Sequence, residues 1–91
     1  MAYRLQFLPE ALKEWEALDG SIKAPLRAAL KKRLENPHVP SAVLGSELAG
    51  CYKIKLRKQG YRLVYVVEDE VLVVIVLAIG KRERLAAYEN A

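Results

Sequence analysis

The sequence predicts a small α+β domain: an N-terminal strand, then a helical hairpin, then a three-stranded antiparallel meander, with the helices on one face of the sheet. Three observations support this fold class: an alternating apolar pattern opens the chain, two stretches of helical periodicity follow, and after Gly50 the period becomes two. A chain of 91 residues, 53% of them hydrophobic, is long enough for a single domain over residues 1–91 with a small core.

The N-terminal part of the chain contains the first strand and both helices. Residues 3–7 alternate between apolar and polar side chains, as a half-buried strand does. Residues 9–18 then place apolar side chains three and four positions apart, which predicts a helix that breaks at Asp19 and Gly20. A second helix is expected to begin near Ser21, a good N-cap residue. The apolar stripe of this helix consists of Ile22, Leu26, Ala29, Leu30 and Leu34.

The C-terminal part of the chain is expected to form most of the sheet. Residues 35–50 contain two prolines and two glycines, which predicts an irregular connection with at most one helical turn. Strands are expected over residues 51–57, 61–67 and 71–79, joined by short turns. The last of them is apolar at every position, which suits a strand with neighbours on both sides. The first strand should therefore occupy its free edge, which gives the spatial order 1-4-3-2.

Positive charge is concentrated in the predicted sheet. Residues 1–50 have seven Lys and Arg against six Asp and Glu, whereas residues 51–91 have eight against five. Five of the basic side chains lie between Lys53 and Arg62, with no acidic residue among them. Directly opposed like charges destabilise a sheet by roughly 0.2 to 1 kcal/mol per pair, so this concentration of charge needs an explanation outside the fold.

The turn within residues 58–60 decides which side chains share a face. A tight two-residue turn pairs odd-numbered residues of one strand with even-numbered residues of the next. The side chains that then share a face are those of Lys53, Lys55, Arg57 and Arg62. A three-residue turn or a bulge, which Gly60 would permit, would instead bury Arg62 in the core at a cost of several kcal/mol. The first register is therefore favoured, with the other face of both strands packed on the helices.

Two explanations of the cationic face are open. In the first, Lys and Arg keep an open sheet face soluble and prevent edge pairing. In the second, the face binds a polyanion. The number of cations, together with Lys81, Arg82 and Arg84 just after the last predicted strand, favours the second explanation. Phosphate is the expected anion, because arginine binds it through two parallel hydrogen bonds.

The sequence lacks the residues that several kinds of catalytic site require. Cys51 is the only cysteine and His38 the only histidine, and we expect a buried thiol and a surface imidazole. The acidic residues 68–70 are adjacent in a turn and point in different directions, so no metal site is expected. No glycine-rich phosphate-binding loop is present, and no cofactor is expected. A set of Lys, Arg and Tyr can still cleave RNA, because the RNA 2′-hydroxyl group supplies the nucleophile.

The sequence also bears on location. The N-terminal segment MAYRLQFLPE lacks the basic and apolar regions of a signal peptide, and the apolar run at residues 71–79 has about half the length of a membrane-spanning helix. The lone cysteine gives no argument for an oxidising compartment. We therefore expect a cytoplasmic protein that makes no contact with membranes.

Three motifs stand out in this chain: CYKIKLR at residues 51–57, GYRLVY at residues 60–65, and GKRER at residues 80–84 followed by a tyrosine. Together they closely resemble the motifs of the RelE family, the mRNA-cleaving toxins of the RelE/ParE superfamily from type II toxin–antitoxin systems. The likeness runs nearly from end to end of the chain and includes MAY and ALKEW near its start. It implies the same α+β fold and cleavage of mRNA in the ribosomal A site after attack by the 2′-hydroxyl group.

The resemblance also implies the residues of the active site. They are Lys53, Lys55, Arg62, Arg82 and Tyr88. The two lysines would stabilise the phosphate and transfer protons, with Lys55 on the leaving-group side. The two arginines would hold the scissile phosphate, and the tyrosine would stack on or orient the nucleotide near its 2′-hydroxyl group. Further RNA contacts are expected from the other cations of this region, Arg57, Lys58, Lys81 and Arg84.

The resemblance implies three partners: an acidic RelB-type antitoxin, the ribosome with its mRNA, and operator DNA reached only through the toxin–antitoxin complex. Gly45 stands where a close relative has an arginine, a departure that bears on one RNA contact. Two other functions remain open. One is a noncatalytic module that uses the basic face to bind RNA, DNA or an antitoxin. The other is a ParE-type toxin that inhibits gyrase, which is disfavoured because that branch does without the Lys, Arg and Tyr set.

Overall fold

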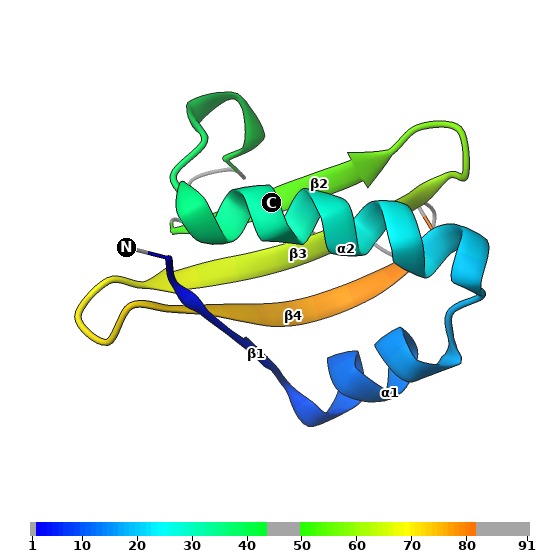
Figure 1. Ribbon diagram of the computed structural model, residues 1–91, viewed down its shortest axis with the longest axis horizontal. Coiled ribbons are helices and arrows are strands. Elements are labelled where there is room, and N and C mark those ends of the chain that lie inside the picture. The colour runs from blue at the N-terminus through cyan, green and yellow to red at the C-terminus, as the bar shows by residue number, and fades with distance from the viewer. Residues whose placement is uncertain (1, 44–49, 82–91) are drawn as a thin grey trace.

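The computed structural model describes residues 2–43 and 50–81 of the chain. In chain order it contains a strand, two helices, a short 3-10 turn and three further strands (Figure 1). They are β1 (Arg4–Phe7), α1 (Pro9–Ala17), α2 (Gly20–Glu35), η1 (Pro40–Ala42), β2 (Cys51–Leu56), β3 (Tyr61–Glu68) and β4 (Val73–Lys81). The predicted α+β class is confirmed, and within the described residues of the irregular connection η1 is a helical turn of the kind expected there.

The four strands form one sheet in the order β1-β4-β3-β2, which confirms the predicted order. β2, β3 and β4 pair antiparallel with one another in chain order. β1 runs parallel to β4, with Arg4 opposite Val73. The sheet is therefore mixed rather than a pure meander. The helices and the other two strands supply the long connection that a parallel pair requires.

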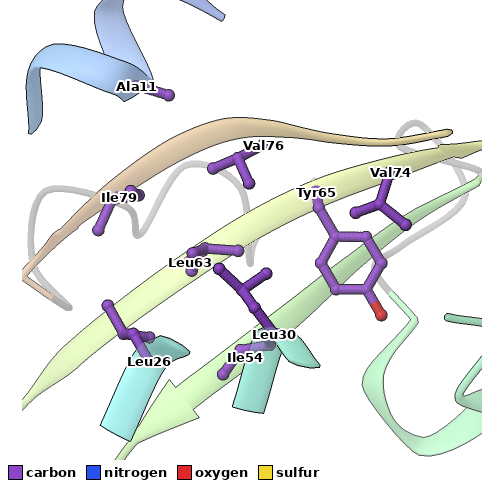
Figure 2. Close-up of a cluster of buried hydrophobic side chains, with 9 residues drawn as sticks. All are labelled: Ala11, Leu26, Leu30, Ile54, Leu63, Tyr65, Val74, Val76 and Ile79. Carbon is purple, nitrogen blue, oxygen red and sulfur yellow. The ribbon is translucent and has the colours of Figure 1, made fainter. Parts of the chain in front are cut away.

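Both helices cover the same face of the sheet (Figure 1). α2 contacts β2, and α1 contacts β1 and β4. The core lies between these layers, and Figure 2 shows its side chains converging from the helices and from three strands. Its buried members are Ala11, Leu26, Leu30, Ile54, Leu63, Tyr65, Val74, Val76 and Ile79. The even-numbered positions of β2 and the odd-numbered positions of β3 face this core, as predicted.

The start of α2 differs from the prediction. Its N-cap is Asp19 rather than Ser21, and the Asp19 carboxylate accepts a hydrogen bond of 3.0 Å from the backbone N–H of Ser21. Both residue types are good caps, and a carboxylate at this position also interacts favourably with the positive end of the helix dipole. The helix consequently begins at Gly20, directly after the break that separates it from α1.

Several strand ends also differ from the prediction. β2 ends at Leu56, and residues 57–60 form a four-residue turn in which the N–H of Gly60 donates to the carbonyl of Leu56 over 2.9 Å. β4 begins at Val73, after Leu72 with a φ of 54°. β4 also continues to Lys81, so this lysine lies within the strand and not after it.

A second, smaller apolar cluster lies on the face of the sheet opposite the helices. Its buried members are Cys51, Val64 and Ala78, which are 7%, 2% and 8% exposed. The expectation of a buried thiol is therefore confirmed. Burial raises the pKa of the Cys51 thiol, which disfavours the thiolate form that a nucleophilic cysteine needs.

Candidate active site

The β2–β3 hairpin brings two predicted site residues directly together. Lys55 lies opposite Arg62 in the ladder, and Lys53 lies opposite Val64. This odd-to-even pairing is the predicted register, although the turn has four residues and not two. By strand alternation the side chains of Lys53, Lys55 and Arg62 lie on the face opposite the helices, beside the apolar cluster of Cys51, Val64 and Ala78.

The end of the hairpin is hollowed by a cavity of about 360 Å³, which we call the hairpin pocket. Its lining residues are Lys55, Leu56, Arg57, Gly60, Tyr61 and Arg62. On β4, Gly80 lies opposite Arg62. A pocket with three cations beside an apolar cluster is suited to a phosphate group, because neighbouring low-dielectric surface strengthens each charge–charge attraction.

The remaining predicted site residues are distributed around this pocket or fall outside the described part of the chain. Lys58 is exposed in the turn. Lys81 pairs with Tyr61 and lines a separate cavity of about 550 Å³ together with Glu14 and Asp19. This cavity lies toward α1, so the structure does not bring Lys81 to the cationic face. The predicted residues outside the described ranges are Gly45, Arg82, Arg84 and Tyr88.

Comparison with known proteins gives the family. The family model of the ParE toxin of type II toxin–antitoxin systems matches residues 5–86. The mRNA interferase toxin RelE of Escherichia coli K12 is 47% identical over 91 residues, which are all of this chain and 95% of the relative. The chain belongs to the RelE/ParE toxin family.

Solved structures agree with this family assignment. The crystal structure of isolated E. coli RelE superposes with a TM-score of 0.86 at 44% identity and covers 98% of this chain and 94% of RelE. RelE in the intact E. coli RelBE toxin–antitoxin complex gives a TM-score of 0.85 at 46% identity, with 88% of this chain and 96% of that chain covered. The fold predicted from the resemblance to RelE is therefore confirmed for the described residues.

In this member of the RelE/ParE family, the lysine-bearing strand is held by a helix residue that the sequence did not single out. The guanidinium group of Arg33 on α2 donates from Nη1 to the carbonyl oxygen of Lys53 over 3.2 Å and to the phenolic oxygen of Tyr65 over 2.9 Å. The Tyr65 hydroxyl in turn donates to the carbonyl of Pro37 over 2.8 Å. Burial raises the pKa of Tyr65, and the neighbouring Arg33 opposes that rise. The sequence signal for this contact is the positive charge of Arg33 on α2, which does not by itself say what the side chain reaches.

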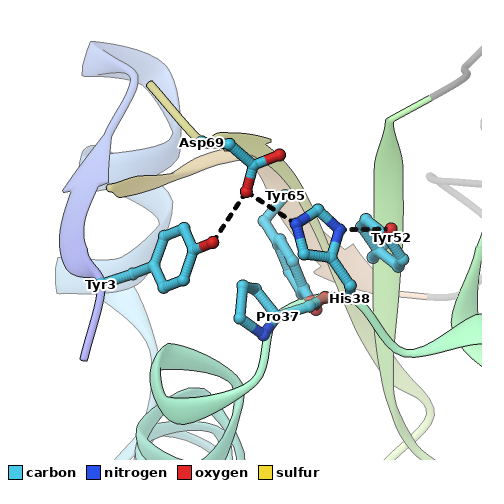
Figure 3. A network of polar contacts seen from close by, with 6 residues as sticks. All are labelled: Tyr3, Pro37, His38, Tyr52, Tyr65 and Asp69. Atoms are coloured by element: carbon cyan, nitrogen blue, oxygen red, sulfur yellow. Dashed lines mark hydrogen bonds and ion pairs between the residues drawn. The ribbon is translucent and has the colours of Figure 1, made fainter. Parts of the chain in front are cut away.

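A second network of polar contacts in this RelE/ParE member lies close to Tyr65 (Figure 3). The two ring nitrogens of His38 lie 2.9 Å from the hydroxyl of Tyr52 and 2.7 Å from the carboxylate of Asp69. Tyr3 also donates to that carboxylate over 2.7 Å. His38 is exposed, as expected, but it joins the α2–η1 connection to β2 and to the β3–β4 turn. The acidic turn is thus solvated and also has specific partners.

Within residues 2–43 and 50–81, the His, Cys, Asp and Glu side chains form no group of three that could hold a metal ion. The helices of that same part of the chain are all too short or too polar to cross a bilayer.

Proposed function

We propose that the chain is the toxin of a type II toxin–antitoxin system and acts as an mRNA interferase, an endoribonuclease that cleaves translated mRNA in the ribosomal A site. The observation that carries this proposal is the pairing of Lys55 with Arg62 at the wall of the hairpin pocket. Similarity over the whole chain to the mRNA interferase toxin RelE supports the same activity.

The proposed reaction uses the 2′-hydroxyl group of the RNA as its nucleophile. The 2′-oxygen attacks the adjacent phosphorus and loses its proton, while the bond from phosphorus to the 5′-oxygen breaks and that oxygen gains a proton. The products are a cyclic phosphate and a 5′-hydroxyl end. The protein has to align the attacking oxygen, stabilise the crowded phosphate and move two protons.

The cationic residues divide this work. Arg62 and Arg82 hold the scissile phosphate and stabilise the charge that develops on it. Lys53 and Lys55 assist the phosphate and the proton transfers, with Lys55 on the side of the leaving 5′-oxygen. Tyr88 orients the nucleotide near its 2′-hydroxyl group. Arg57, Lys58 and Arg84 add sequence-independent RNA contacts.

The same face accounts for the partners. An acidic antitoxin of the RelB type neutralises the cations when no RNA is bound, as the RelBE complex of the E. coli relative suggests. The toxin–antitoxin complex, and not the toxin alone, would contact operator DNA. A protein that acts on translating ribosomes works in the cytoplasm.

Primer extension on mRNA translated in a purified system tests the proposal. The wild-type protein should produce new 5′ ends at codons in the A site, and Arg62→Gln should reduce the cleavage rate by about 10²- to 10³-fold, since it removes a charge that acts on the transition state. Lys32→Gln is the matched control: it removes one positive charge from an exposed position on α2, and cleavage should be retained. Equal rates for the wild-type and Arg62→Gln proteins would reject the assigned site.

A second function, inhibition of DNA gyrase as by a ParE-type toxin, is favoured by one observation: the match to the family model of the ParE toxin. Inhibition of DNA gyrase supercoiling by this protein, without cleavage of translated mRNA, would establish that alternative. Salt-dependent RNA binding with neither activity would instead identify a noncatalytic binding module.

A further inference from the structure

A second cationic cavity lies at the outer edge of β2. Its volume is about 380 Å³, and we call it the edge pocket. Its lining residues are Arg33, Ser41, Ala42, Lys53, Lys55 and Arg57. Four of these six carry a positive charge and none is acidic, so an anion is the ligand that the pocket suits. The cations come from two separate parts of the chain, the helix α2 and the strand β2 with its turn.

Arg33 is held in place before any ligand arrives. Its Nη1 atom donates to the Lys53 carbonyl and to the Tyr65 hydroxyl, and its guanidinium carbon lies 5.8 Å from the centre of the Tyr65 ring. Tyr65 itself is fully buried. These contacts use one end of the guanidinium fork, so the donors on Nη2 and Nε can serve a ligand in the pocket. A preorganised arginine loses little side-chain freedom when it binds phosphate.

The edge pocket adjoins the hairpin pocket. Lys55 and Arg57 line both cavities, so they form the shared wall between them. A polyanion that places one phosphate beside Arg62 can therefore continue along β2 and place another beside Arg33. Ser41, from the turn η1, adds a hydroxyl donor on the far side of the edge pocket.

We propose that the edge pocket is a second phosphate subsite, which binds a phosphodiester group next to the scissile one on the same RNA strand, with Arg33 as its principal contact. The identity of the polyanion as RNA rests on the proposed function, whereas the pocket's preference for phosphate does not. Arg33 is a binding residue in this scheme and takes no part in the bond-breaking step.

Equilibrium binding tests the subsite without any need for cleavage. The probe is a single-stranded RNA in which every 2′-hydroxyl group is methylated, and its binding is measured by fluorescence anisotropy at several salt concentrations. Arg33→Gln should weaken binding about tenfold and reduce the salt slope by about 0.7, the value for one phosphate contact on a single strand. Lys32→Gln removes the same charge from the next position on α2, which lines neither pocket, and should leave the slope unchanged. Equal effects of the two substitutions, or no salt-dependent binding by the wild-type protein, would overturn the subsite.

A second measurement separates binding from a purely structural effect of Arg33. Single neutral methylphosphonate linkages are placed one at a time beside the cleavage site of the mRNA, and the rate of A-site cleavage is compared with that of unmodified mRNA. A methylphosphonate at one neighbouring linkage should slow cleavage by the wild-type protein about tenfold and leave the cleavage rate of Arg33→Gln unchanged. If both proteins respond alike at every position, Arg33 only supports the strand. Binding that follows the prediction in the absence of any cleavage would reject the proposed function and retain the subsite.

Discussion

At the scale of single residues, the most informative side chain is Tyr65. Its ring is buried in the core and stacks on Tyr52 at 5.5 Å between centroids, while its hydroxyl links Arg33 to the carbonyl of Pro37. A buried hydroxyl is tolerated because it both donates and accepts hydrogen bonds. One core residue thereby connects the helix, the α2–η1 connection and the strand that holds the lysines.

The shared face of Lys53, Lys55 and Arg62 was predictable from the sequence, whereas the pairing of Lys55 with Arg62 and the role of Arg33 were not. Strand alternation has a period of two, so the positions of the charges and one assumption about the turn were enough for the first result. A helical period places Arg33 on a face of α2 but does not say how far a long, flexible side chain reaches around the neighbouring sheet edge. The choice of Asp19 over Ser21 as N-cap was also open, because both side chains can accept from the first turn.

The carboxylate of Asp69 predicts a dependence of stability on pH. Its pKa is lowered first by the hydrogen bond with His38 and then by that with Tyr3. A carboxyl group whose pKa is lower in the folded state stabilises the fold at pH values above its unfolded pKa, and this contribution is lost as the pH falls through the folded pKa. As the pH is lowered below about 4, the melting temperature of the wild-type protein should therefore decrease, and that of the Asp69→Asn variant should decrease less.

Thermal unfolding followed by circular dichroism between about pH 7 and pH 2 measures this difference. Glu70→Gln serves as the control, because it removes the same charge from the adjacent position of the turn. If the melting temperatures of Asp69→Asn and of the wild-type protein decrease equally at acidic pH, the His38 and Tyr3 contacts do not contribute to stability.

At the scale of elements, the β2–β3 hairpin depends on one backbone conformation. Gly60 closes the turn with a φ of 70°, and a Cβ atom built there would meet no heavy atom within 4 Å. The constraint is therefore conformational and not steric contact with neighbours. The strands on either side were predictable from their alternation, but the length of the turn was not, because a two-residue turn at Lys58-Gln59 and the four-residue turn at residues 57–60 give the same pairing of Lys55 with Arg62.

Substitution of this glycine tests how strongly the turn supports the hairpin. Gly60→Ala should lower the free energy of unfolding by about 1 kcal/mol, since alanine is strained in the left-handed region. Gly20→Ala is the matched control: the space around it is equally open, but Gly20 lies in the first turn of α2 and has no positive φ. It should leave stability unchanged or raise it by up to about 1 kcal/mol. Urea unfolding measures both, and equal effects would mean that the turn is not strained by alanine.

At the scale of the whole molecule, the sheet order could be inferred because only one strand was left to occupy the free edge of β4. The direction of that strand could not, since periodicity is the same for parallel and antiparallel pairs. The outcome, β1 parallel to β4, depends on how the long connection packs its two helices on one face of the sheet. Periodicity likewise does not show that Val64 and Ala78 are buried on the cationic face.

The parallel pairing of β1 with β4 has a consequence for folding during synthesis on the ribosome. The first strand to be synthesised has its partner almost 70 residues later, since Arg4 pairs with Val73. The nascent chain therefore cannot close its sheet until β4 has been translated. A toxin that attacks translating ribosomes would gain from this delay, because the sheet that supports the cationic β2–β3 hairpin is complete only after β4 has been made. A chain truncated after residue 70 should accordingly be unfolded by circular dichroism, whereas a folded truncated chain would refute this dependence on β4.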